Sequence, residues 1–119
     1  MKKQLLVVCR HAPYSTSLAK EGLDFALAAG VFDQNISLLF LGEGLWQLKK
    51  DQQSNALGMK NLGKALSALP LYDIDNIYVE KASLMALGLN EADLLMAVET
   101  LDESGIATLL ATADVIFNF

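Results

Sequence analysis

Short apolar runs alternate along the chain with segments whose polar residues recur every three to four positions. The first run, Leu5–Cys9, is apolar without a break, which is typical of a strand buried on both faces of a sheet. From Ser17 the period changes, because Ser17, Lys20, Glu21 and Asp24 fall on one polar stripe of a helix. The pattern therefore predicts a buried strand followed by a helix that is covered on most of its circumference.

A second strand and a tight turn follow this helix. Gly30 is a natural stop for the helix, and Asn35–Leu41 is again nearly all apolar. Gly42–Gly44 has the composition of a turn, and Leu45–Leu48 is predicted to form a short helical turn. The carboxyl end of this strand is where open α/β sheets place their working surface.

The second half of the chain continues the alternation. Asp102 occupies the position of a helix N-cap, and the apolar face of the helix after it is formed by Ile106, Leu109, Leu110 and Ala113. Five apolar runs separated by helices predict an α/β fold: a single-domain, three-layer, doubly wound sheet of about five mostly parallel strands across residues 1–119. The other predicted elements are a helix at Asn55–Leu69 ended by Pro70, strands at Asn76–Glu80 and Leu94–Thr100, helical turns at Ala82–Leu87, and a strand at Val115–Phe119.

Composition restricts the kinds of partner and compartment. The chain is 53% hydrophobic and only 19% charged, against a usual ~25% charged, so we expect oligomerisation to cover apolar surface. The net charge is −5, and the only adjacent basic residues are Lys2-Lys3 and Lys49-Lys50, which argues against direct binding of nucleic acid. The apolar run before Arg10 is too short for a signal peptide, and none approaches a membrane span. We therefore expect a cytoplasmic protein.

Cys9 and His11 are the candidates for catalysis, and they allow two interpretations. Their position at the carboxyl end of the first strand, with Arg10 between them, is compatible with a cysteine–histidine nucleophile pair. Cys9 is alternatively a small hydrophobic residue that ends a buried strand, which is the usual environment of a free cysteine. The second interpretation is favoured, so no catalytic residue is assigned. As the only cysteine, Cys9 also excludes an intramolecular disulfide and a CxxC metal site.

No cofactor or metal site is expected. The turn at Gly42–Gly44 lacks the third glycine and the lysine of a phosphate-binding loop, and Glu43 would repel a phosphate. The carboxylates of the chain do not pair with a histidine at ligand spacing, so they are interpreted as solvated surface groups.

Trp46 is the strongest candidate for recognition, because aromatic residues are enriched at interface hot spots. Its neighbours Glu43 and Leu45 belong to the same candidate interface. Phe117 and Phe119 are candidates at the other end of the chain. The segment around Trp46 contains no nucleophile, metal ligand or phosphate clamp, which favours a binding surface over a catalytic one.

Several motifs in matching order resemble the DsrE/DsrF-like family of small sulfur-relay proteins, and within it the TusC (DsrF-type) branch. The resemblance covers nearly the whole length of the chain. Its motifs are EGLD at Glu21–Asp24, SLLFLGEGLWQL at Ser37–Leu48, LYDI at Leu71–Ile74, ASLMALGL at Ala82–Leu89 and ADVIFNF at Ala113–Phe119.

The resemblance implies a subunit without catalytic chemistry of its own. It implies a heterohexamer with TusB-like and TusD-like sister subunits, served by TusA-like and TusE-like sulfur carriers and leading to 2-thiolation of the tRNA wobble uridine. In the family the sulfur-carrying cysteine belongs to the TusD type and follows the third strand. The equivalent point here is close to Glu80, which cannot carry a persulfide. Two alternatives stay open: a DsrF-type subunit of a DsrEFH sulfur-oxidation complex, and a sulfurtransferase that depends on Cys9.

Overall fold

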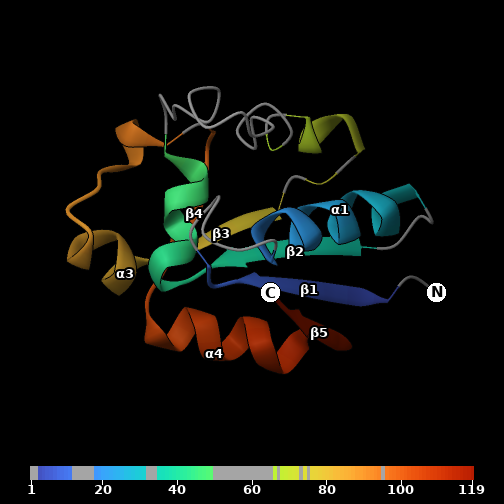
Figure 1. The fold of residues 1–119 in the computed structure, drawn as a ribbon. Coiled ribbons are helices and arrows are strands. Elements are labelled where there is room, and N and C mark those ends of the chain that lie inside the picture. The colour runs from blue at the N-terminus through green and yellow to red at the C-terminus, as the bar shows by residue number, and fades with distance from the viewer. Residues whose placement is uncertain are drawn as a thin grey trace.

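The fold is a five-stranded, wholly parallel sheet with helices on both of its faces (Figure 1). The computed structural model describes residues 3–11, 18–31, 35–49, 66, 68–72, 74, 76–94 and 96–119. The strands lie in the order β4-β3-β2-β1-β5, which confirms the predicted α/β class and the parallel sheet. Their bounds are β1 Gln4–Cys9, β2 Asn35–Phe40, β3 Asn76–Glu80, β4 Glu99–Leu101 and β5 Val115–Asn118.

The two longest described helices lie on opposite faces of this sheet. The helix α1, Leu18–Val31, lies on the upper face in Figure 1, and α4, Glu103–Thr112, lies alone below the sheet among the described elements. The short helix α3, Lys81–Ala86, lies at the carboxyl ends of the strands. Three 3₁₀ segments complete the described structure: η1 Gly42–Leu48, η3 Leu69–Tyr72 and η4 Glu91–Asp93.

The core is divided by the sheet into a thick and a thin half. On the α1 side, Val7, Leu38, Phe40 and Val79 from the strands pack with Leu23 and Ala26 of α1 and with further buried residues of η1, η3 and α3. On the α4 side, only Leu6, Val8 and Leu39 are fully buried among the described residues. Alternate residues of β1 and β2 thus enter the two halves, as the period of a strand requires.

Two apolar residues, Leu94 and Leu110, have environments that differ from those predicted. The strand predicted at Leu94–Thr100 is correct only at Glu99 and Thr100, because β4 comprises Glu99–Leu101. Leu94 is buried in the thick core and forms an isolated antiparallel bridge with Lys49, so its apolar character reflects core packing. Leu110, expected on the buried face of α4, is 39% exposed, while Ile106 and Leu109 pack on the sheet.

Smaller differences concern element ends. The helix α1 runs one residue past Gly30, and η1 begins at Gly42, so the predicted turn is the start of a 3₁₀ helix. Pro70 lies inside η3. The predicted helix at Asn55–Leu69 falls mostly outside the described residues. Asp102 caps α4 as expected, since its Oδ1 accepts a hydrogen bond from the Gly105 N–H at 2.8 Å.

Gly44 is required because η1 crosses directly over the end of β1. A Cβ atom at Gly44 would lie 2.0 Å from the Cys9 carbonyl oxygen and 2.7 Å from its carbon. Both contacts are with backbone, which is itself fixed by the Leu41 N–H donating to the same Cys9 oxygen at 3.0 Å. The crossing therefore leaves no room for any side chain at this position.

Gly44→Ala should lower the free energy of unfolding by about 3 kcal/mol or more, because backbone would have to move to admit the methyl group. Gly42→Ala is the matched control two residues away. Gly42 has φ +52° but open space around its Cβ position, so only the left-handed conformation is penalised, by about 1–2 kcal/mol. Urea unfolding of both variants measures the difference. Equal losses for the two would contradict the close approach.

Candidate functional site

The carboxyl edge of the sheet, where β1, β2 and β3 end, brings together three segments that are distant in sequence. The Leu41 N–H donates to the Cys9 carbonyl, and the Gln47 side-chain amide donates to the His11 carbonyl at 2.9 Å. The segments η1 and α3 lie beside each other at this edge (Figure 1). Gln47 is only 1% exposed, so its amide acts as an internal brace for the loop after β1.

A polar chain joins the end of β3 to the start of η1. The Ser83 hydroxyl donates a hydrogen bond to Oε1 of Glu80, and the same hydroxyl accepts one from the Gly42 N–H at 2.9 Å. Ser83 is buried, so this chain satisfies a hydroxyl that would otherwise lack partners. The sequence does not predict this role of Ser83. The only feature that could indicate it is the position of a serine in the first turn of the helix that begins directly after Glu80.

The Glu80 carboxylate is therefore held in place at the position where the sulfur-carrying cysteine of the family was expected. Glu80 is the last residue of β3, immediately before α3, and the chain leaves α3 through Gly88 at φ +69°. This matches the strand, short helix and glycine that surround the family's cysteine in the resemblance described above. The residue at this point is a fixed carboxylate and not a thiol.

Cys9 is enclosed in the thick half of the core and has no access to solvent for chemistry. It is 2% exposed, and burial raises the pKa of its thiol to about 12. Because the thiolate is the nucleophilic form, a thiol with this pKa is inert near neutral pH. The environment matches the interpretation of Cys9 as a small hydrophobic residue.

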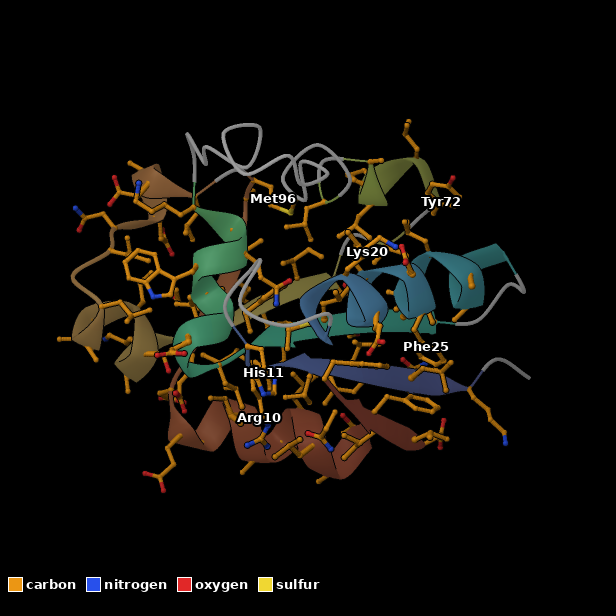
Figure 2. All side chains as sticks on the ribbon, viewed as in Figure 1. Arg10, His11, Lys20, Phe25, Tyr72 and Met96 are labelled. Carbon is orange, nitrogen blue, oxygen red and sulfur yellow. The ribbon has the colours of Figure 1, made fainter. Side chains whose placement is uncertain are left out.

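His11 lies next to Arg10 where the chain leaves β1, and the two are labelled in Figure 2. The Nδ1 atom of His11 is buried and has no hydrogen-bond partner among the described residues. Within that part of the chain, no hydrogen bond joins His11 to the Cys9 sulfur. The structure therefore does not assemble the two candidates into a nucleophile–base pair.

The candidate interface residues around Trp46 have three different environments. Glu43 is exposed on the first turn of η1, and Trp46 is half-buried, with one part of its side chain packed against the thick core. Leu45 is 0% exposed. It therefore supports η1 from beneath and is removed from the residues that can touch a partner.

Phe117 and Phe119 pack within the chain. Both are half-buried and lie against Phe25 of α1, with their ring centroids 4.4 Å and 5.8 Å from that of Phe25, respectively. A Cβ atom at Gly22 would lie 3.0 Å from Phe119, so the glycine inside α1 makes room for this ring. Their main role here is to join β5 and the segment after it to α1.

The described residues also bear on two other features, a metal site and a membrane-spanning helix. Within these residues, no group of three or more His, Cys, Asp or Glu side chains is arranged to hold a metal ion. No described helix combines the length and apolar character needed to cross a membrane.

The buried Cys9 thiol should resist a thiol reagent such as a maleimide in the folded protein and react after unfolding in urea. Burial raises its pKa in the folded protein to about 12, above the ordinary value of 9.0 for a thiol in water. The folded state thus keeps a proton that the unfolded state loses, and this thiol lowers stability as pH rises from 9 towards 12. Cys9→Ala should remove that part of the pH dependence. The free energies of unfolding of the wild type and of Cys9→Ala, measured by urea unfolding at several pH values between 8 and 11, give the difference. Rapid labelling of the folded chain at pH 7 would contradict the burial.

Comparison with known proteins extends the likeness from the fold to the whole sequence. In the solved structures, the crystal structure of the YchN protein from E. coli superposes with a TM-score of 0.84 over 100% of both chains, at 19% identity, and shows the same fold. "Protein TusC homolog" of Pseudomonas aeruginosa is 41% identical over 114 residues, which cover 96% of each chain.

Two further relatives carry the TusC name and the DsrF name. "Protein TusC" of Buchnera aphidicola is 36% identical over 118 residues, covering 98% of this chain and 99% of the relative. "Intracellular sulfur oxidation protein DsrF" of Allochromatium vinosum is 33% identical over 131 residues, covering 98% and 96%. The model of the DsrE/DsrF-like family matches residues 3–119. The chain belongs to the DsrE/DsrF-like family.

Proposed function

We propose that this chain is a non-catalytic subunit of a TusBCD-type sulfur-relay complex in the cytoplasm. The complex passes persulfide sulfur towards 2-thiolation of the tRNA wobble uridine, and this chain supplies structure and docking surface. Membership of the family and the TusC names of relatives at 41% and 36% identity support the assignment.

The inaccessibility of the single thiol is the observation that carries the proposal. A sulfur relay needs a cysteine whose sulfur can meet the donor and then the acceptor. The only cysteine of the chain is Cys9, which is buried with a raised pKa. The carboxyl end of β3 holds Glu80 instead. Persulfide transfer must therefore use a thiol of a sister subunit.

The surface at the carboxyl edge has the composition of a docking site. Met85 on α3 is 70% exposed, and Trp46 of η1 lies partly exposed at the same edge. Glu43 and Lys81 add exposed charge of both signs beside these apolar groups. A flexible methionine and an aromatic side chain on two adjoining segments, with charged residues on the same segments, resemble the centre and rim of a protein interface.

Assembly is tested by co-expressing the chain with TusB-like and TusD-like sisters and measuring the native mass of the purified complex. A complex that contains two copies of each chain is expected, with 12.9 kDa from each copy of this one. A monomer that ignores both sisters would refute the proposal.

The relay function is tested in cells that lack this chain. Loss of 2-thiouridine from tRNA is expected, with restoration by the wild type and equally by Cys9→Ala, because the Cys9 thiol takes no part in transfer. Mass spectrometry of digested tRNA measures the modification. If Cys9→Ala assembles but does not restore thiolation, the Cys9-dependent alternative is correct.

Trp46→Ala should weaken incorporation of the chain into the complex roughly tenfold or more, as expected for an aromatic hot spot. Leu71→Ala is the control, because Leu71 on η3 is 84% exposed but lies away from the carboxyl edge. Competition for incorporation against the wild-type chain measures the effect. Thermal unfolding of each variant alone separates the loss of docking from the loss of core packing by Trp46.

The DsrF relative, at 33% identity over 98% of this chain, favours one second candidate. In that case the same kind of subunit would serve sulfur oxidation. The tRNA measurement decides between them, since unchanged 2-thiouridine after removal of the chain would favour the sulfur-oxidation pathway.

A further inference from the structure

The face of the sheet below β1 and β2 is covered less completely than the opposite face. Five strands spaced by about 4.8 Å place the axes of the two outer strands about 19 Å apart, whereas one helix is about 10–12 Å wide. Among the described elements α4 alone covers this face (Figure 1). Ile116 of β5 lies in register with Leu6, which is buried on this side of the sheet, and Ile116 is 40% exposed. A single helix therefore leaves apolar sheet surface accessible.

The outer surface of α4 is also unusual for a helix that faces water. From Ser104 to Ala113 it carries no ionisable side chain, and Leu110 is 39% exposed. By contrast, α1 presents Lys20, Glu21 and Asp24 to solvent on the other side of the same sheet. Helices that stay in contact with water normally have such a charged face. The uncharged α4 surface thus indicates contact with another protein.

The charges at the two ends of α4 identify the kind of partner. Asp102 and Glu103 are exposed where the helix begins, and Asp114 is exposed just after it ends. In a pair of identical copies related by a two-fold axis, acidic ends would meet acidic ends whether the helices ran parallel or antiparallel. The net charge of −5 adds to this repulsion. A second copy of this chain is therefore disfavoured.

We propose that the surface formed by α4 and β5, with Leu110 and Ile116 at its exposed apolar positions, docks a different protein chain. That chain presents an uncharged apolar centre flanked by basic residues opposite Glu103 and Asp114. The inference rests on the proposed function, in which the occupant is one of the two sister subunits. It gives the chain a second docking surface separate from the carboxyl edge, as contact with two different neighbours requires.

The test is competition between two copies of the chain during assembly. The sisters are co-expressed with equal amounts of the wild-type chain and a mass-distinguishable variant, and the ratio in the purified complex is measured by mass spectrometry. Ala107→Lys places a charge on α4, and Ala28→Lys is the matched control on α1. Both alanines are exposed helix residues with an acidic residue four positions earlier, Glu103 or Asp24. Asp24 already binds Lys20 at 2.9 Å, so the stability of each variant is also measured on the chain alone.

Ala107→Lys should be incorporated at least tenfold less than the wild type, and Ala28→Lys about equally. Glu103→Gln, which removes one flanking charge, should be incorporated a few-fold less. Thermal unfolding of the variants alone is expected to be unchanged within a few degrees for all three. These results together would support an apolar docking surface with basic flanks on the partner.

Incorporation of Ala107→Lys or of Glu103→Gln equal to the wild type would overturn the inference while the complex itself still forms. Failure of the wild type to assemble with the sisters would instead refute the proposed function, and the inference with it. A dimer of this chain alone that Ala107→Lys dissociates would identify a second copy as the occupant and would also overturn the inference.

Discussion

The contact between the Gly44 backbone and the end of β1 determines how the carboxyl edge is built. Because η1 passes over the Cys9 carbonyl with no room for a Cβ atom, the segment after β2 must turn back across β1. That path places the Gly42 N–H against Ser83 and the Gln47 amide against the His11 carbonyl. The ends of β1, β2 and β3 are thereby locked together, and Trp46 and Glu80 are held at fixed positions on the edge.

The same crossing explains why the thiol of the chain is unavailable. Cys9 is covered by η1 and by core side chains, so its burial follows from the architecture of the edge and cannot be relieved by a rotamer change alone. A relay protein that kept its sulfur on β1 would have to expose this crossing. The carboxyl end of β3 leaves Glu80 partly accessible and carries a carboxylate here. The buried thiol and the carboxylate at the end of β3 are the features of this chain that support the proposed non-catalytic role.

Much of the fold could be predicted from the sequence, because buried parallel strands produce continuous apolar runs and their ends are marked by glycine, proline or charge. Asn76–Glu80 was located without error, and Asp102 was found as a cap. Leu94 was misread because burial in a core and burial in a sheet produce the same apolar signal. The site was harder. Burial of Leu45 and the role of Ser83 depend on contacts between segments some forty residues apart in sequence, which no local pattern records.

Leu110 shows how a misread residue can be more informative than a correct one. Its spacing with Ile106 predicts a buried position, and α4 does bury Ile106 and Leu109 against the sheet. A single exposed apolar side chain is common on protein surfaces, but exposed apolar residues on neighbouring elements of one face mark a contact site. The absence of charge along the rest of α4 points in the same direction. The helix period predicts an apolar face on α4 that is wider than the part buried against the sheet. The exposed part of that face, at Leu110, belongs to the surface that we propose another chain covers.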